Sequence, residues 1–240
     1  NINELKKRLR QMNSIEAIKL FDVAEFIAHK SIWIIGGDGW AYDIGFSGLD
    51  HVLSTGENVN ILVLDTEVYS NTGGQKSKSS PLGASAKFAT TGKTTSKKDL
   101  AWQALSHGKA YVAQIAMGAN DAHTVKTILE AEEYNGPSLI IAYSHCIAHG
   151  YDMCHGIDQQ DNAVKSGYWP LFRFNPMKET GKRFTLDSKE PTLQLSDFIY
   201  NENRFNVIKK EHPEKAEEFL ALAENDVRMK WRRLEALKGL

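Results

Sequence analysis

The feature that most constrains the fold is a regular alternation of short apolar runs with helical patterns over the first 175 residues. The apolar runs occupy residues 32–35, 59–64, 111–116 and 139–142. Helical spacing of apolar residues marks residues 14–30, 41–54, 99–107 and 121–134. Strands that are apolar on both faces and separated by helices are typical of parallel sheets covered on both sides. The sequence therefore predicts an α/β fold, with a mostly parallel sheet and helices on both of its faces.

This alternation stops after Pro176. Residues 177–199 are irregular, with a short strand expected near Phe184, and residues 214–237 show the pattern of a long amphipathic helix. The apolar stripe of that helix must be buried; it consists of Leu220, Ala223, Val227, Trp231 and Leu234. We therefore expect an α/β domain over residues 1–175 and a C-terminal extension over residues 176–240. The extension would pack on this domain or on a partner subunit.

Residues 67–98 also break the alternation. They show no apolar periodicity and are rich in Ser, Thr, Gly and Lys, with six lysines and no acidic residue between Val68 and Lys98. A stretch this long without regular structure inside a compact domain is usually functional or disordered. The simplest interpretation is a solvated loop, and the alternative is a lid that contacts a cofactor, an acidic partner or an anionic substrate.

Composition excludes several classes of function. The chain has 29 Lys and Arg against 30 Asp and Glu, a net charge of −1, which gives no electrostatic case for a nucleic-acid or membrane-surface partner. Its longest apolar runs are far too short to span a bilayer. Two cysteines cannot form a disulfide framework, so we expect a reducing, cytoplasmic location. Asn1 is not a start methionine, and no apolar signal core follows it, which suggests a processed chain or a fragment.

The first motif that could bind a ligand is a glycine-rich turn after the first predicted strand. It reads Gly-Gly-Asp-Gly-Trp over positions 36–40. Glycines allow close approach of a ligand, and a helix N-terminus attracts phosphate. Asp38 would repel a bare phosphate unless a divalent cation such as Mg²⁺ lay between them. The alternative is an ordinary turn with Asp38 as a helix N-cap. A dinucleotide-type Gly-x-Gly-x-x-Gly is absent because position 42 is Tyr.

The second motif follows the next predicted strand. It reads Asp-Thr-Glu-Val-Tyr-Ser-Asn-Thr-Gly-Gly-Gln over positions 65–75. Consecutive parallel strands are often neighbours, so this segment is expected beside the glycine-rich turn. The Thr66 hydroxyl and the Val68 carbonyl would then complete an oxygen shell around a cation anchored by Asp38. Alone, the segment is also compatible with a simple chain reversal.

Together the two segments resemble the thiamine-diphosphate motif of pyruvate:ferredoxin (flavodoxin) oxidoreductases. The likeness includes Trp-Ile-Ile-Gly-Gly-Asp-Gly-Trp-Ala-Tyr-Asp-Ile-Gly at 33–45 and extends over most of residues 14–175. The general thiamine-diphosphate signature has an Asn pair at the second segment, whereas this chain has Thr66. That departure fits the pyruvate:ferredoxin branch and argues against a decarboxylase or a transketolase.

The resemblance implies a role for each residue of the two segments. Asp38, Thr66 and the Val68 carbonyl would hold Mg²⁺. With these three, the residues that would line the cofactor are Gly37, Gly39, Trp40, Glu67, Tyr69, Ser70 and Asn71. Asn71 is the expected catalytic residue, because its amide would reach toward the substrate and the reactive thiazolium carbon, where it can hydrogen-bond developing charge.

A third group of residues, His145, Cys146, His149, Cys154 and His155, lies within eleven positions. Such a group suggests zinc, although the spacing matches no common zinc motif; loop histidines and buried thiols are the alternative. The resemblance instead implies that Cys146 ligates the 4Fe–4S cluster nearest the thiamine. Such a cluster needs about four thiolates, and the family supplies the other three from a segment upstream of Asn1. Cys154 matches no ligand role.

The resemblance therefore implies the diphosphate-binding part of a pyruvate:ferredoxin oxidoreductase. Its reaction is the CoA-dependent oxidative decarboxylation of pyruvate to acetyl-CoA and CO₂, with electrons leaving through iron–sulfur clusters to ferredoxin or flavodoxin. We expect this chain alone to be inactive and to need the rest of the polypeptide or partner subunits, in a full enzyme that is a homodimer. Two alternatives remain: a β-type subunit of another 2-oxoacid:ferredoxin oxidoreductase, and a non-catalytic binding or assembly domain that retains the fold.

Overall fold

The computed structural model describes residues 2–27 and 30–240 of the chain. Its internal contacts divide the chain into two compact units, Asn1–Ile32 and Trp33–Leu240. Among the described residues, no helix combines the length and the apolar character needed to cross a membrane.

The smaller unit is helical. Its elements are α1 (Ile2–Leu9), α2 (Ile15–Val23) and a 3-10 helix, η1 (Ala24–Ile27). Ser14 caps α2 by accepting a hydrogen bond from the Ala17 amide. The helix predicted over 14–30 is confirmed as far as position 27, with a tighter final turn. Residues 28 and 29 lie outside the described residues, and Lys30 is not helical.

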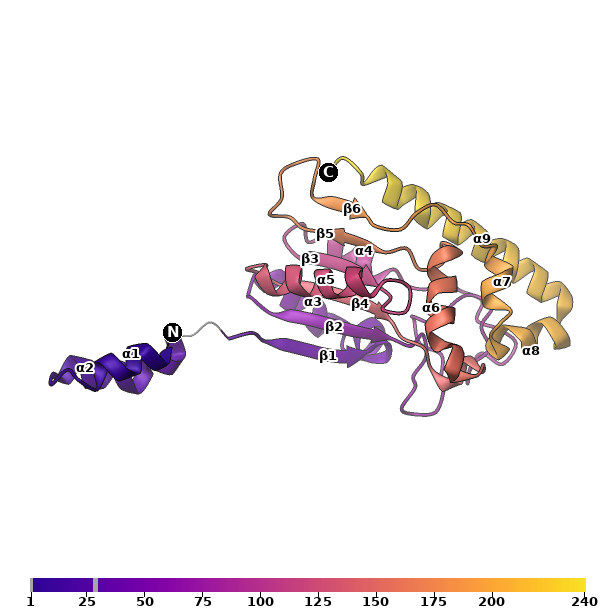
Figure 1. The fold of residues 1–240 in the computed structure, drawn as a ribbon. Helices are drawn as coiled ribbons and strands as arrows, with labels where there is room; N and C mark the ends of the chain where they lie inside the picture. The colour runs from indigo at the N-terminus through magenta and orange to yellow at the C-terminus, as the bar shows by residue number, and fades with distance from the viewer. Residues whose placement is uncertain (1, 28–29) are drawn as a thin grey trace. The chain divides into compact units, whose positions relative to one another are not determined.

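The larger unit is built on a six-stranded sheet in the order β1-β2-β4-β3-β5-β6 (Figure 1). Its strands are β1 (Trp33–Gly37), β2 (Asn60–Asp65), β3 (Tyr111–Ile115), β4 (Ser138–Tyr143), β5 (Phe172–Phe174) and β6 (Phe184–Leu186). The first four strands along the chain are parallel, β5 pairs with β3 in antiparallel fashion, and β6 pairs with β5 in the same way. The four predicted parallel strands and the strand near Phe184 are confirmed, whereas β5 was not predicted.

Helices cover the sheet on both faces, as the alternation predicts. They are a π-helix, η2 (Gly39–Ile44), then α3 (Phe46–Thr55), α4 (Leu100–Leu105), α5 (Asp121–Glu133), two 3-10 turns, η3 (Ile147–His149) and η4 (Met153–His155), α6 (Gly156–Lys165), α7 (Leu195–Ile199), α8 (Asn203–Glu211) and α9 (Pro213–Ala236). The predicted helix over 41–54 thus divides into η2 and α3. The Trp40 ring lies so close to Gly45 that a β-carbon there would be 2.1 Å from the ring, so only glycine fits at this junction.

Two cores lie on opposite faces of the sheet. On β4, Leu139 and Ile141 face the larger core under α3 and α4, and Ile140 faces the smaller core under α5. This alternation is the period of two expected for a strand buried on both sides. The region after position 176 joins the larger core through Phe184, Leu195, Phe198, Ile199, Phe205 and Leu234. Within the apolar stripe of α9, Leu234 is buried in this core, and Leu220, Ala223 and Val227 pack against it partly buried.

The lysine-rich segment over 67–98 contains no helix and no strand, only isolated bridges, and all of its residues are described. It is nevertheless not a solvated loop, because Ser77 and residues 79–84 are buried. Lys93 is also buried, and its ammonium donates to the carbonyl oxygens of Ser80 (2.6 Å) and Ser96 (3.2 Å). The segment thus packs as an irregular layer held by buried polar contacts.

Candidate cofactor site

The site lies at the carboxyl ends of β1 and β2. These strands are paired in parallel register, with Gly37 opposite Leu64, so the two turns that carry the motifs follow neighbouring strands. Asp38 comes directly after β1, and Thr66 comes directly after β2. The predicted juxtaposition of the two segments is therefore present.

Three oxygens gather at this edge. The Thr66 hydroxyl donates to Asp38 Oδ1 (2.9 Å) and lies 3.0 Å from the Val68 carbonyl oxygen. The second oxygen of Asp38 accepts a hydrogen bond from the Ser77 hydroxyl at 2.6 Å. Asp38 occupies the N-cap position of η2, but its side chain makes no capping hydrogen bond and is directed to Thr66 and Ser77 instead. Burial, together with the negative charge of Asp65, raises the pKa of Asp38 to about 6.

The glycine at position 39 makes room for an aromatic ring. A β-carbon there would stand 2.3 Å from the ring of Tyr69, whose hydroxyl donates to the Gly39 carbonyl at 3.2 Å. Trp40 similarly lies against Gly36, where a β-carbon would be 2.5 Å from its ring. Gly36 and Gly39 are thus required by contacts within the protein, in addition to any approach of a ligand, whereas a β-carbon at Gly37 would meet only the Leu64 carbonyl oxygen at 4.0 Å.

Glu67 behaves differently from its neighbours in the turn. It has a positive φ of 61° and is buried. Its carboxylate accepts hydrogen bonds from Tyr168 (2.5 Å), Lys97 (3.2 Å) and Arg204 (2.7 Å). Burial alone would raise its pKa, but the charges of Lys97 and Arg204 lower it to about 2. The backbone of Glu67 therefore belongs to the turn, while its side chain is an ionised anchor inside the protein.

Lys97 links this anchor to the end of β2. Its ammonium donates to Asp65 Oδ2 at 2.8 Å as well as to Glu67, and it also contacts the Ser79 hydroxyl. The same oxygen of Asp65 also accepts a hydrogen bond from the Tyr42 hydroxyl at 2.6 Å, and Oδ1 accepts one from the Glu67 amide at 3.0 Å. Lys97 therefore points inward and forms ion pairs with two buried carboxylates.

The carbonyl of Thr66 is held by His149. The distance from His149 Nε2 to the Thr66 oxygen is 2.7 Å; because a carbonyl only accepts, Nε2 must carry the hydrogen. Burial, reinforced by the charge of Arg204, lowers the pKa of His149 to about 3, so the ring is neutral. Its Nδ1 has no hydrogen-bond partner among the described residues and lies 3.8 Å from Glu202 Oε1.

The remaining predicted residues lie farther along the second segment. Ser70 and Asn71 are exposed, in a turn closed by a hydrogen bond from the Gly73 amide to the Ser70 carbonyl. The Ser70 hydroxyl lies 3.2 Å from the sulfur of buried Cys146. The structure thus brings Cys146 to the edge of the candidate site, next to the turn that carries Asn71.

Besides Cys146, His149 also reaches the site through the Thr66 carbonyl, whereas the other three members of the Cys/His group do not join it. Cys154 is exposed, His145 bonds to Gln160 (3.0 Å), and His155 lies 3.4 Å from Asp158. No cluster of three or more His, Cys, Asp or Glu suited to a metal occurs within the described part of the chain. The zinc interpretation thus has no ligand set among these residues.

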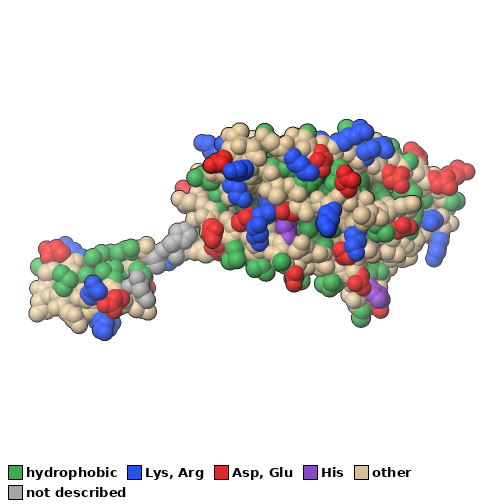
Figure 2. All heavy atoms as spheres, turned by 45° about the horizontal axis from the view of Figure 1, so that its top comes forward, with side chains coloured by type: hydrophobic (Ala, Val, Ile, Leu, Met, Phe, Trp, Pro, Cys, Tyr) green, Lys and Arg blue, Asp and Glu red, His purple; other side chains and the backbone are tan. Residues whose placement is uncertain are grey.

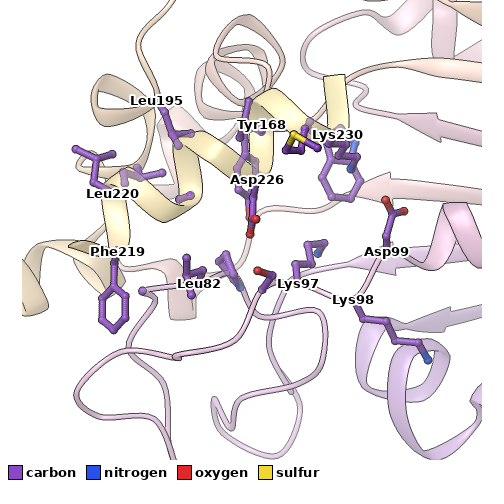
Figure 3. Close-up of a pocket in the computed structure, with 18 of the residues that line it drawn as sticks. Leu82, Lys97, Lys98, Asp99, Tyr168, Leu195, Phe219, Leu220, Asp226 and Lys230 are labelled. Carbon is purple, nitrogen blue, oxygen red and sulfur yellow. The ribbon is translucent and has the colours of Figure 1, made fainter. Parts of the chain in front are cut away.

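A separate cavity of about 190 Å³ lies between α9 and residues 96–101 (Figure 3). One end is apolar, with Leu195 and Leu220, and the other carries Lys97 and Lys230. The Lys230 ammonium lies 3.4 Å from Gln114 Oε1, and burial lowers its pKa. Lys97 thus borders both this cavity and the buried carboxylates of the cofactor site.

The surface offers no strong charge asymmetry on the face seen in Figure 2, where Lys and Arg side chains are interspersed with Asp and Glu over the larger unit. This mixture agrees with the net charge of −1.

Comparison with known proteins gives a consistent result. A family model described as "Thiamine pyrophosphate enzyme, C-terminal TPP binding domain" matches residues 17–142. The pyruvate-flavodoxin oxidoreductase of Rhodospirillum rubrum is 52% identical over 237 residues, covering 98% of this chain and 20% of that protein. The pyruvate:ferredoxin oxidoreductase of Moorella thermoacetica is 55% identical over 218 residues, covering 90% of this chain and 18% of that protein.

The chain thus spans about a fifth of the length of these curated relatives. Among solved structures, a 2-oxoglutarate:ferredoxin oxidoreductase from Magnetococcus marinus is 26% identical, with a TM-score of 0.45 over 48% of this chain and 40% of that one. That likeness is too weak to bear on fold or substrate. The family match and the identities nevertheless confirm the resemblance to pyruvate:ferredoxin (flavodoxin) oxidoreductases, and the chain belongs to the family of C-terminal thiamine pyrophosphate-binding domains of thiamine pyrophosphate enzymes.

Proposed function

We propose that this chain binds the diphosphate of thiamine diphosphate (thiamine pyrophosphate) through Mg²⁺ held by Asp38, Thr66 and the Val68 carbonyl. The observation that supports this most directly is that the Thr66 hydroxyl lies within 3.0 Å of both Asp38 Oδ1 and the Val68 carbonyl oxygen, in two turns that follow neighbouring parallel strands. One carboxylate, one hydroxyl and one carbonyl suit a hard cation that takes its remaining ligands from phosphates and water. The residues present therefore fit Mg²⁺.

The cofactor, when bound, supplies a thiazolium carbon that attacks a 2-oxo acid and stores the electrons released with CO₂. We propose that Gly37, Gly39 and Trp40 line it from the first turn. From the second turn, Glu67, Tyr69, Ser70 and Asn71 would do so. Asn71 is proposed to hydrogen-bond the substrate oxygen, a role for which its exposed position in the turn leaves the amide accessible.

We further propose that the parent enzyme carries out CoA-dependent oxidative decarboxylation of pyruvate and passes electrons to ferredoxin or flavodoxin. The support is the identity of 52% and 55% to proteins named for this activity. Cys146 is proposed as one ligand of a 4Fe–4S cluster. The chain contains only two cysteines and Cys154 is exposed, so these residues do not by themselves fit a cluster that needs about four thiolates.

We also propose that residues 1–175 form the cofactor-binding part and that residues 176–240 form an extension packed on it. The parent enzyme is proposed to be cytoplasmic and homodimeric. It also implies that the isolated chain, mixed with thiamine diphosphate, Mg²⁺, pyruvate, CoA and an electron acceptor, gives no turnover.

Calorimetric titration with thiamine diphosphate tests the cofactor site. Wild-type protein should bind only when Mg²⁺ is present, and Asp38→Ala should abolish binding because it removes the only carboxylate of the proposed ligand set. Asp50→Ala is the matched control, since Asp50 is an exposed aspartate on α3. Absence of Mg²⁺-dependent binding in the wild type, or equal binding by Asp38→Ala, would refute the proposed site.

A further inference from the structure

We infer that Arg204, in the first turn of α8, is the positioning residue that holds the metal-binding turn in its working conformation. It does so through a hydrogen-bonded ion pair with Glu67, which lies in sequence between the proposed ligands Thr66 and Val68. This inference rests on the proposed function, and it assigns a role at the cofactor site to the C-terminal part of the chain.

The backbone conformation of Glu67 needs stabilising contacts from outside the turn. Its φ of 61° lies in the left-handed region, which a residue other than glycine rarely adopts without compensation. The peptide groups on either side of Glu67 carry the Thr66 and Glu67 carbonyls, and the Val68 carbonyl lies one peptide group farther along the chain. A change of the Glu67 backbone would therefore move the Val68 oxygen relative to the Thr66 hydroxyl, which is now 3.0 Å away.

Arg204 supplies these contacts, because its guanidinium donates hydrogen bonds to two carboxylates. Its Nη2 donates to Glu67 Oε2 at 2.7 Å, and its Nε donates to Glu202 Oε2 at 2.6 Å. All three side chains are buried, with at most 6% of each residue exposed. The planar guanidinium fork can satisfy two carboxylates at once, which the single ammonium of lysine cannot do in the same way.

Arg204 is itself held in place. Its carbonyl accepts a hydrogen bond from the Ser85 amide at 2.7 Å, and Glu202 accepts a second one from Gln159 at 3.1 Å. The backbone of Arg204 is thus bonded to the segment over 67–98, and its guanidinium is linked through Glu202 to Gln159 on α6. Lys97 and Tyr168 also contact Glu67, but both do so at its other oxygen, Oε1, whereas Arg204 bonds Oε2.

The experiment must separate positioning from simple stability, because removal of Arg204 leaves Glu202 as a buried, unpaired charge. The variants are Arg204→Met and the double variant Arg204→Met with Glu202→Gln. The double variant removes the unpaired charge, keeps a hydrogen-bonding group for Gln159, and leaves Glu67 intact. Arg173→Met is the matched control: Arg173 is also buried and bonds Glu130 (2.5 Å) and Asp187 (2.7 Å), but it lies on β5.

Two readouts are measured beside the thermal midpoint of each variant. The first is hydrogen exchange of the peptide over residues 65–71 without cofactor. The second is the affinity for thiamine diphosphate in the presence of Mg²⁺. Positioning predicts faster exchange in this peptide and an affinity lowered by about tenfold or more in both Arg204 variants, even though the double variant regains thermal stability. Arg173→Met should lose stability without either change.

The inference is overturned if exchange and affinity in the double variant return to wild-type values together with the thermal midpoint, since Arg204 would then serve stability alone. It is equally overturned if Arg173→Met alters residues 65–71 as strongly as Arg204→Met does. Absence of cofactor binding by the wild type would refute the proposed function instead, and the exchange measurement would still decide whether Arg204 holds the turn.

Discussion

The ring of Tyr69 lies directly against the α-carbon of Gly39, so that a β-carbon at position 39 would stand 2.3 Å from ring atom Cε1. The two residues come from the two turns of the candidate site, which follow β1 and β2. Their contact shows that the turns are fitted to each other as well as to a ligand, and it leads to the first prediction.

Gly39→Ala should displace Tyr69, destabilise the protein by about 1–3 kcal/mol through overpacking, and weaken Mg²⁺-dependent cofactor binding. Urea denaturation and calorimetric titration measure the two effects. Adding Tyr69→Ala to Gly39→Ala should recover part of the lost stability, because the clash is removed. Gly48→Ala is the control: nothing lies within 4 Å of its β-carbon position, and a helical Gly→Ala change should stabilise by roughly 0.5–1 kcal/mol. A neutral Gly39→Ala would show that the ring moves aside freely.

Thr66→Val should lower the affinity for Mg²⁺ and thiamine diphosphate by about tenfold, because it keeps the side-chain shape but removes a hydroxyl that contacts both Asp38 and the Val68 carbonyl. The affinity is measured by titration of the cofactor at fixed Mg²⁺. Val68→Ala should cost about 1 kcal/mol of stability but leave the affinity unchanged, since the proposed ligand at position 68 is a backbone oxygen. Equal affinities for Thr66→Val and wild type would remove the hydroxyl from the ligand set.

The stability of the protein should fall as the pH drops below 6.5, in part because of His149. Its pKa is about 3 in the folded protein, whereas an unfolded histidine titrates near 6.5. Between these values the unfolded state binds the additional proton, so lower pH favours unfolding, by up to about 1.4 kcal/mol per pH unit. His149→Gln keeps a donor for the Thr66 carbonyl but does not titrate. Its unfolding free energy, measured in urea from pH 4 to 7, should depend less steeply on pH than that of the wild type, whereas exposed His51→Gln should follow the wild type.

Lys230→Met should stabilise the protein at pH 7 by about 1 kcal/mol, because burial disfavours the charged amine and methionine fills a similar volume beside the cavity. The folded-state pKa of Lys230 is lowered. The unfolded state therefore binds the additional proton below the ordinary value of 10.5, and wild-type stability should rise with pH toward that value. The advantage of Lys230→Met should accordingly shrink between pH 7 and 10. Lys215→Met, an exposed position on α9, should show no such trend; a pH-independent gain for Lys230→Met would contradict the explanation.

The features that the sequence predicts correctly are those with local causes. The four parallel strands are visible as apolar runs because each is buried on both sides. The meeting of Asp38 with Thr66 follows from the tendency of consecutive parallel strands to be neighbours. The helix predicted over 41–54 is confirmed as α3 from Phe46 onward, whereas its first residues belong to the π-helix η2, whose C-cap is Gly45 beside the Trp40 ring.

The features that the sequence does not reveal depend on distant partners. Glu67 looks like a cofactor-lining residue within its motif, yet its carboxylate is directed to Arg204, 137 positions away. The lysine-rich segment looks solvated by composition, but Lys93 and Lys97 find carbonyl and carboxylate oxygens in the interior. β5 has only three residues, too few for a recognisable period. No local pattern in a single sequence carries such information.

The separation between Glu67 and Arg204 also has a consequence for the order of events during biosynthesis. A ribosome adds roughly 5–20 residues per second, so the 137 residues between the two positions take on the order of ten seconds to synthesise. Throughout that interval the nascent turn lacks its guanidinium partner. Competence to take up the cofactor should therefore arise late, when α8 docks, and a ribosome stalled between these positions would present a folded strand pair with an unfinished turn.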